Sequence, residues 1–137
     1  FFKHNYIIRY MKIKNQQKIW NKIAPEWFEF RDKPLKEVIF FLKKQKSLSK
    51  LGQTEGRILD LGGGAGRHLL NFKNGKMYLV DFSEEMIKFA KQNAKKGKVN
   101  AEFIVSKAEK LPFSNNFFDA GICVALLQCI PGEKKRI

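Results

Sequence analysis

Residues 57–70 read RILDLGGGAGRHLL, and we begin with this stretch because it predicts the fold. A short apolar run that includes Asp60 is followed by three consecutive glycines. The apolar pattern resumes at Leu69 and Leu70, so the stretch predicts a buried strand, a tight turn and the first turn of a helix. Because glycine has no Cβ, such a turn brings backbone N–H groups close to a ligand.

The spacing of the glycines separates two classes of ligand. A dinucleotide-binding turn has the pattern G-x-G-x-x-G, which counted from Gly62 needs a glycine where Arg67 stands. The stretch from Asp60 to Gly66 reads D-x-G-x-G-x-G instead. It resembles motif I of the class I methyltransferases that use S-adenosylmethionine (SAM). A plain strand-to-helix loop is the alternative interpretation.

The composition indicates one globular domain with an excess of positive charge. The chain has 137 residues, of which 44% are hydrophobic, and its thirteen Phe are enough to build a core. Its formal net charge of +14 favours polyanions such as nucleic acid, although a lysine-rich proteome would give the same excess. Thirteen basic and five acidic residues precede Arg57, so the N-terminal part is relatively the more basic.

Neither a membrane segment nor a metal site is expected from the sequence. No run approaches the roughly 18 apolar residues of a membrane span, and the N-terminus lacks the apolar region of a signal peptide. We therefore expect a cytoplasmic protein without membrane contact. Cys123 and Cys129 have no CxxC or histidine spacing, which favours buried thiols over a metal site or a disulfide.

Periodicity predicts helices that alternate with strands. Apolar residues recur at helical spacing between Ile19 and Phe28, where Pro25 is expected to break or restart the helix. A second helix is expected to begin at Pro34. A third begins after the cap Ser83 and stops at Gly97, and further strands are expected at 77–80, 103–105 and within 117–127. This alternation predicts a doubly wound parallel sheet.

The chain divides into three parts. Residues 1–18 are an N-terminal extension of uncertain status, residues 19–56 form helices of a substrate or lid region, and residues 57–137 form a Rossmann-like SAM-binding core. The sequence opens with Phe1 and stops where another helix would begin. We therefore expect a fragment whose sheet is truncated after about the fourth strand.

Asp81 closes the second strand of the core. It follows Gly62 by nineteen residues, and a carboxylate at a strand end can accept hydrogen bonds from both hydroxyls of a ribose. A place in the cap of the following helix is the alternative. Phe82 comes next and can lie along a purine face.

A second resemblance to the SAM-dependent methyltransferases begins at Ser106. Residues 108–130, AEKLPFSNNFFDAGICVALLQCI, are similar to the pattern A-E-x-LPF, a turn, FD and an apolar strand. The resemblance places Lys107 and Ala108 beside the adenine, although the family usually has an Asp where Lys107 stands. The cofactor-binding residues expected on these grounds are Asp60, Gly62, Gly63, Gly64, Gly66, Asp81, Phe82, Lys107, Ala108 and Cys123.

The N-terminal block narrows the family further. Residues 20–44, WNKIAPEWFEFRDKPLKEVIFFLKK, resemble a block of the tRNA wobble-uridine carboxymethyl methyltransferases, as does the closing run 133–137. Phe30 and Leu35 depart from the family's Thr and Trp. This resemblance implies methylation of a carboxymethyl group on a wobble uridine in tRNA, with a small zinc-binding activator subunit as partner.

Methyl transfer to a carboxylate needs no general base, because a carboxylate is already ionised at pH 7. The expected enzyme therefore works by holding its two reactants in line, and we name no certain catalytic residue. Arg31 is our candidate for gripping the carboxylate of the substrate or of SAM, and a surface pair with Asp32 or Glu29 is the alternative.

Three other functions remain open at this stage. The first is a SAM-dependent methyltransferase of a small molecule, such as a quinone, which shares every motif from Asp60 onward. The second is a nucleotide-binding oxidoreductase, which would need a better glycine pattern. The third is a non-catalytic subunit or fragment.

Overall fold

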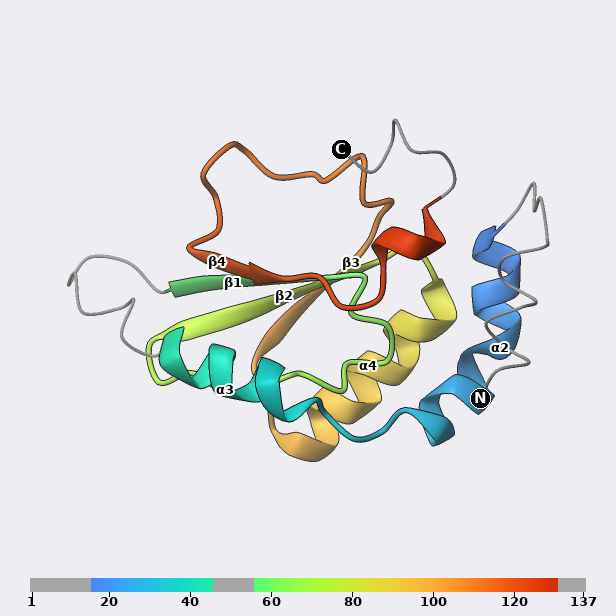
Figure 1. Cartoon of the computed structure of the whole chain (residues 1–137), viewed down its shortest axis with the longest axis horizontal. Helices are drawn as coiled ribbons and strands as arrows, with labels where there is room; N and C mark the ends of the chain where they lie inside the picture. Colours follow the sequence, from blue (N-terminus) through green and yellow to red (C-terminus); the bar gives the residue numbers. More distant parts are fainter. Residues whose placement is uncertain (1–15, 46–55, 131–137) are drawn as a thin grey trace.

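The sheet has four parallel strands in the part of the chain that the structure describes. The structure is a computed structural model, and it describes residues 16–45 and 56–130 (Figure 1). The strands lie in the order β3-β2-β1-β4. Their bounds are Gly56–Leu61 for β1, Gly75–Asp81 for β2, Ala101–Val105 for β3 and Ala120–Ile122 for β4. The expected Rossmann-like, parallel architecture is confirmed.

The strand order reverses beside β1. The chain runs outward from β1 to β2 and β3, and then returns to pair β4 with the other side of β1. Because all strands are parallel, their carboxyl ends meet at one edge. In open sheets of this kind, ligands bind at that edge where the order reverses.

Two helices cover one face of the sheet (Figure 1). Leu42 of α3 (Lys36–Lys44) is fully buried in a cluster with Met77 of β2. Leu79, two residues further along β2, packs instead on Ile87 and Ala90 of α4 (Glu84–Gly97). Alternate residues of a strand point to the same face, so α3 and α4 share this side.

Aromatic side chains cover the other face. Tyr78 of β2 lies edge-on to Phe117 and Phe118, with ring centroids 5.4 and 5.5 Å away, and Phe113 lies 6.0 Å away. All three phenylalanines belong to the connection between β3 and β4, which Figure 1 shows on the side of the sheet opposite α3 and α4. We call these four residues the aromatic cluster.

Helix α2 (Gln16–Phe30) stands beside the carboxyl ends of the strands (Figure 1). The expected break at Pro25 is wrong, because the helix continues through it. A proline inside a helix costs about 3 kcal/mol. Packing on α4 offsets this cost: Ala24 is buried against Met86, and the ring of Phe28 stacks on Phe89 at 4.8 Å.

The helix expected after the glycine turn does not form. Residues 67 and 68 lie in a turn, residues 69 and 70 belong to no helix or strand, and only eight residues separate Gly66 from β2. Leu69 and Leu70 pack into the cluster that contains Leu42, and the Leu70 N–H donates to the Met77 sulfur at 3.3 Å. Helix α3, which precedes β1 in the chain, therefore covers the sheet beside this short connection.

Other boundaries differ by small amounts. Ser83 caps α4 as expected, with its Oγ accepting from the Met86 N–H at 3.2 Å, but the left-handed residue at the end is Lys98 rather than Gly97. Helix α3 begins two residues after Pro34. The fourth strand covers only three of the residues expected for it. The sequence also predicts a linker over 47–56; its residues 47–55 lie outside the described residues, and Gly56 already belongs to β1. The N-terminal residues 1–15 and the closing run 133–137 lie outside the described residues as well.

The two cysteines are less buried than expected. Cys123 is exposed and Cys129 is half-buried. Cys123 follows the three-residue strand β4, which pairs only with β1 among the described residues, so little packs around it. Among these residues, no helix combines the length and the apolar character needed to cross a bilayer.

Candidate functional site

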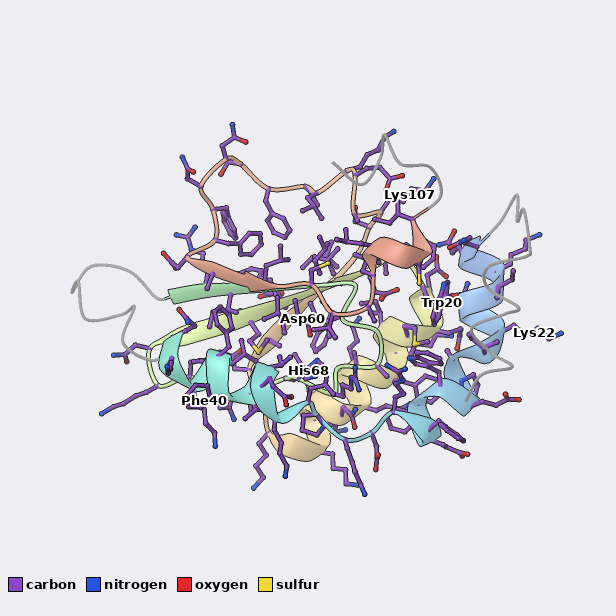
Figure 2. All side chains as sticks on the ribbon, viewed as in Figure 1. Trp20, Lys22, Phe40, Asp60, His68 and Lys107 are labelled. Atoms are coloured by element: carbon purple, nitrogen blue, oxygen red, sulfur yellow. The ribbon has the colours of Figure 1, made fainter. Side chains whose placement is uncertain are left out.

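A cavity of about 490 Å³ opens at the carboxyl ends of β1 and β2. The glycine turn and Asp81 form its floor, and α2 forms the opposite wall with Trp20 and Trp27. Figure 2 labels Trp20, Asp60, His68 and Lys107, four of the residues that line it. The loop after β3 and the segment around η2 (Leu127–Cys129) complete the lining.

Asp81 connects the glycine turn to the start of α4. Its Oδ2 accepts from the Gly64 N–H at 3.0 Å and its Oδ1 from the Ser83 N–H at 2.9 Å. Burial raises the pKa of this carboxyl, while the backbone hydrogen bonds from Ser83, Gly64 and Phe82 lower it. A carboxylate offers about four lone-pair sites, so both oxygens can still accept from a ligand. The contact near the helix cap is thus present, and the ribose contact stays a prediction.

Two adjacent glycines are required for different reasons. Gly64 has a φ of +56°, and a Cβ built there would meet only the Met86 sulfur, at 3.8 Å, so it borders open space. A Cβ on Gly63 would lie 2.6 Å from Leu79 Cγ and 2.8 Å from the Asp60 carboxylate. Gly63 therefore serves close packing, whereas Gly64 keeps the cavity floor free of side chains.

Asp60 lies beneath the turn with an unsatisfied oxygen. Its side chain is 1% exposed, and Oδ2 has no hydrogen-bond partner among the described residues. Burial, together with the nearby Asp81 charge, raises the pKa of this carboxyl to about 7, against the opposite effect of Arg67. An unpaired buried polar atom is costly. The site therefore suits a ligand that carries a donor.

Some of the remaining expected residues line the cavity and others do not. Phe82, Lys107 and Ala108 line the cavity with Gly62, and the Arg31 guanidinium lies there 4.7 Å from the centre of the Trp27 ring. Cys123 does not line it, whereas Cys129 does. Gly66 lies just outside the lining, and a Cβ there would come within 2.7 Å of Leu69.

Sequence reasoning missed the polar residues that fix α2 over the cavity. Gln17 Nε2 donates to the Phe82 carbonyl at 2.7 Å, and Asn21 Oδ1 accepts from Ser83 Oγ at 2.6 Å. Residues four apart lie on the same face of a helix, so this pair was visible in the sequence as a polar site on an otherwise aromatic stripe.

A family model described as a methyltransferase domain matches residues 53–137. The chain belongs to this methyltransferase family. The crystal structure of a SAM-dependent methyltransferase from Aquifex aeolicus is 26% identical, with a TM-score of 0.61 over 82% of this chain and 62% of that one. At the level of the family, the expected class of enzyme and its SAM cofactor are confirmed.

Curated relatives of the methyltransferase domain act in quinone biosynthesis by name. The ubiquinone/menaquinone biosynthesis C-methyltransferase UbiE of Francisella philomiragia is 36% identical over 84 residues, which are 56% of this chain and 34% of the relative. The chain therefore spans about a third of the length of that relative. PKMT2 of Rickettsia typhi, solved in complex with AdoHcy, shares the fold at 23% identity, with a TM-score of 0.53 over 60% of this chain and 16% of that one.

The residues at the cavity floor fit SAM. The amino-acid end of SAM carries an ammonium, which would supply a donor for the unpaired Asp60 Oδ2. The open space beside Gly64 leaves room for the ligand to lie against the turn.

We predict that an alanine at position 64 mainly weakens ligand binding, whereas an alanine at position 63 mainly lowers folding stability. Gly64→Ala meets no close atom, so its cost in folding is the left-handed φ alone, about 1–2 kcal/mol, while the new methyl group weakens binding of S-adenosylhomocysteine. Gly63→Ala clashes with Leu79 and lowers the free energy of unfolding more. Urea denaturation and calorimetry separate the two effects. Equal losses of stability would contradict this distinction.

We predict that stability falls as the pH rises from about 4 to above 7. In the unfolded chain Asp60 ionises near the ordinary aspartate value of 3.8, whereas in the folded protein it holds its proton up to about 7, so the folded state binds more protons in this window. Each pKa unit is worth about 1.4 kcal/mol. Urea titrations across the window test this, and Asp60→Asn, which cannot ionise, should flatten the slope. An unchanged slope in that variant would assign the effect to another group.

Proposed function

We propose that the protein is a SAM-dependent methyltransferase and that this domain binds the cofactor along its glycine turn. The observation that supports this most directly is that one cavity joins the carboxyl ends of β1 and β2 to the wall of α2. The strand ends carry the groups that suit a nucleoside and an amino acid. The wall formed by α2 carries aromatic and cationic groups that suit a methyl acceptor.

Each end of the cofactor has a proposed contact. The ribose hydroxyls donate to the remaining lone pairs of Asp81, and the adenine lies between Phe82 and the backbone near Ala108. Lysine has no acceptor, so Lys107 contributes through its main chain or its charge. The ammonium donates to Asp60. Cys123, which lies outside the cavity lining, has no place in this arrangement.

Bound SAM would supply an activated methyl group on a positively charged sulfur, for transfer to an electron pair of the acceptor. The chain's part is to hold the two groups in line and to exclude water. His68, the one imidazole that lines the cavity in the described residues, already accepts through Nε2 from the Leu35 N–H, so that nitrogen does not serve as a base.

The acceptor that we propose first is a small planar molecule of the quinone type. The names of the curated relatives support it. The cavity offers an aromatic wall formed by Trp20 and Trp27, whose rings stand edge to face with centroids 5.2 Å apart, and a planar ring packs well against aromatic side chains.

Methylation of a carboxymethyl uridine in tRNA is the second candidate. It is supported by the resemblance of residues 20–44 and by Arg31, whose guanidinium lines the cavity and can grip a carboxylate. The relatives that we compared support the small-molecule acceptor better. The activator subunit and the cytoplasmic location stay predictions.

We predict micromolar binding of S-adenosylhomocysteine by the full-length protein, measured by calorimetry. Asp81→Asn should weaken it by about tenfold or more, since an amide loses the charge and one acceptor atom. Glu26→Gln, an exposed change on α2, is the control and should bind as the wild type does. Binding by Asp81→Asn as tight as that of the wild type would refute the ribose contact.

The two acceptors differ in their expected response to salt. With labelled SAM, we expect methyl transfer to a quinol-type acceptor whose KM changes little between 50 and 200 mM salt, roughly the range over which phosphate contacts are lost. Transfer to tRNA carrying 5-carboxymethyluridine, with steep loss of binding over this range and with an activator supplied, would establish the second candidate instead. Activity on neither acceptor would reject both.

A further inference from the structure

The glycine turn is held from outside by side chains that follow it directly. His68 Nε2 accepts from the Leu35 N–H at 3.1 Å, and Arg67 Nη1 donates to the Lys33 carbonyl at 3.5 Å. Two neighbouring residues thus bind the loop between α2 and α3, residues 31–35, to the turn. These contacts occupy the place in the chain where a helix was expected.

His68 is suited to a permanent acceptor role. Its side chain is 3% exposed, and burial and the Arg67 charge lower its pKa to about 4. The ring is therefore neutral near pH 7, and with Nε2 unprotonated it accepts from Leu35 while Nδ1 keeps its hydrogen.

The loop that His68 holds begins with Arg31. The Arg31 N–H donates to the Trp27 carbonyl at 3.0 Å, and its guanidinium packs over the ring of the same residue. Both Arg31 and Arg67 line the cavity. Burial and then the Arg31 charge lower the pKa of Arg67, whereas the Asp60 charge raises it, so the three groups interact.

These charges match the two ends of an amino acid. The guanidinium groups of Arg31 and Arg67 can donate to a carboxylate, and the Asp60 carboxyl can accept from an ammonium. All three line the cavity that the glycine turn borders, and the charges of Arg31 and Asp60 both act on Arg67. The acceptor wall formed by Trp20 and Trp27 is continuous with it.

We propose that His68 is a positioning residue that holds the 31–35 loop on the glycine turn, so that Arg31 meets the carboxylate of the cofactor's amino-acid end. This rests on the proposed function, because it takes SAM as the ligand. Under this proposal, cofactor affinity depends on the hydrogen bond from the Leu35 N–H to the His68 ring, although neither residue need touch the cofactor.

The first experiment compares two ligands on the full-length protein. S-Adenosylhomocysteine carries the amino-acid end, whereas 5′-methylthioadenosine has the same nucleoside without it. His68→Ala should weaken the first by about tenfold, the loss of roughly one charge-assisted contact, and leave the second unchanged. Arg31→Gln should give the same pattern. His68→Gln, whose side-chain oxygen can accept, should recover part of the loss.

The second experiment removes the donor of the same bond. Leu35 has φ −74° and ψ 129°, a conformation that proline adopts, so Leu35→Pro deletes the N–H without strain at φ. It should reproduce the ligand pattern of His68→Ala, and the double variant should be no worse than either single one. Glu37→Gln, exposed on α3, is the control. Hydrogen exchange at the Leu35 amide reports the bond without any ligand and should accelerate in His68→Ala.

Three other results would overturn either this proposal or the proposed function. Equal losses for the two ligands in His68→Ala would overturn the proposal, since a general disturbance of the site does not select the amino-acid end. Unchanged affinity despite faster exchange at Leu35 would overturn it as well. A wild type that binds neither ligand would refute the proposed function itself, and the exchange at Leu35 would then still decide whether His68 holds the loop.

Discussion

The carboxylate of Asp81 is the contact on which the rest of the site depends. It stands at the end of β2, yet its two oxygens bind the glycine turn after β1 and the first turn of α4. The glycine turn, β2 and the start of α4 thus meet at one side chain. The cost of burying that carboxylate is offset by the hydrogen bonds that it accepts from backbone N–H groups. These bonds hold the glycine turn in place although one side of it faces the cavity.

The N-terminal helices α2 and α3 form one wall of the cavity and cover part of the sheet. Gln17 and Asn21 fix α2 to the residues just after β2, while α3 fills the face of the sheet beside the short β1–β2 connection. A methyltransferase cavity needs a wall facing the strand ends, and here that wall comes from residues that precede the first strand. The segment that the sequence marks as a lid is therefore, within the described residues, a packed part of the domain.

Local patterns were sufficient for part of this structure. The strands, the Ser83 cap and the glycine turn were predictable because each depends on residues within one or two turns of the chain. The continuous α2 through Pro25 was not, since packing on α4 decides it. The same holds for His68: its role depends on the Leu35 N–H, thirty-three residues away, and no spacing rule connects the two.

For the site, the sequence was enough to predict which residues lie at the cavity floor, but not the separate role of each. The D-x-G-x-G-x-G motif identified the cavity floor, but the separate roles of Gly63 and Gly64 depend on where Leu79 and Asp60 lie. Cys123 was misplaced because the end of a three-residue strand could not be located from hydropathy alone.

The edge-to-face pair on α2 also determines how the molecule can be observed. The chain has two tryptophans, and both line the cavity. Their emission therefore comes from one place, with Arg31 against one ring and the glycine turn opposite. In most domains such a signal averages over several unrelated environments. Here the intrinsic fluorescence of this chain reports on its ligand cavity without any attached dye.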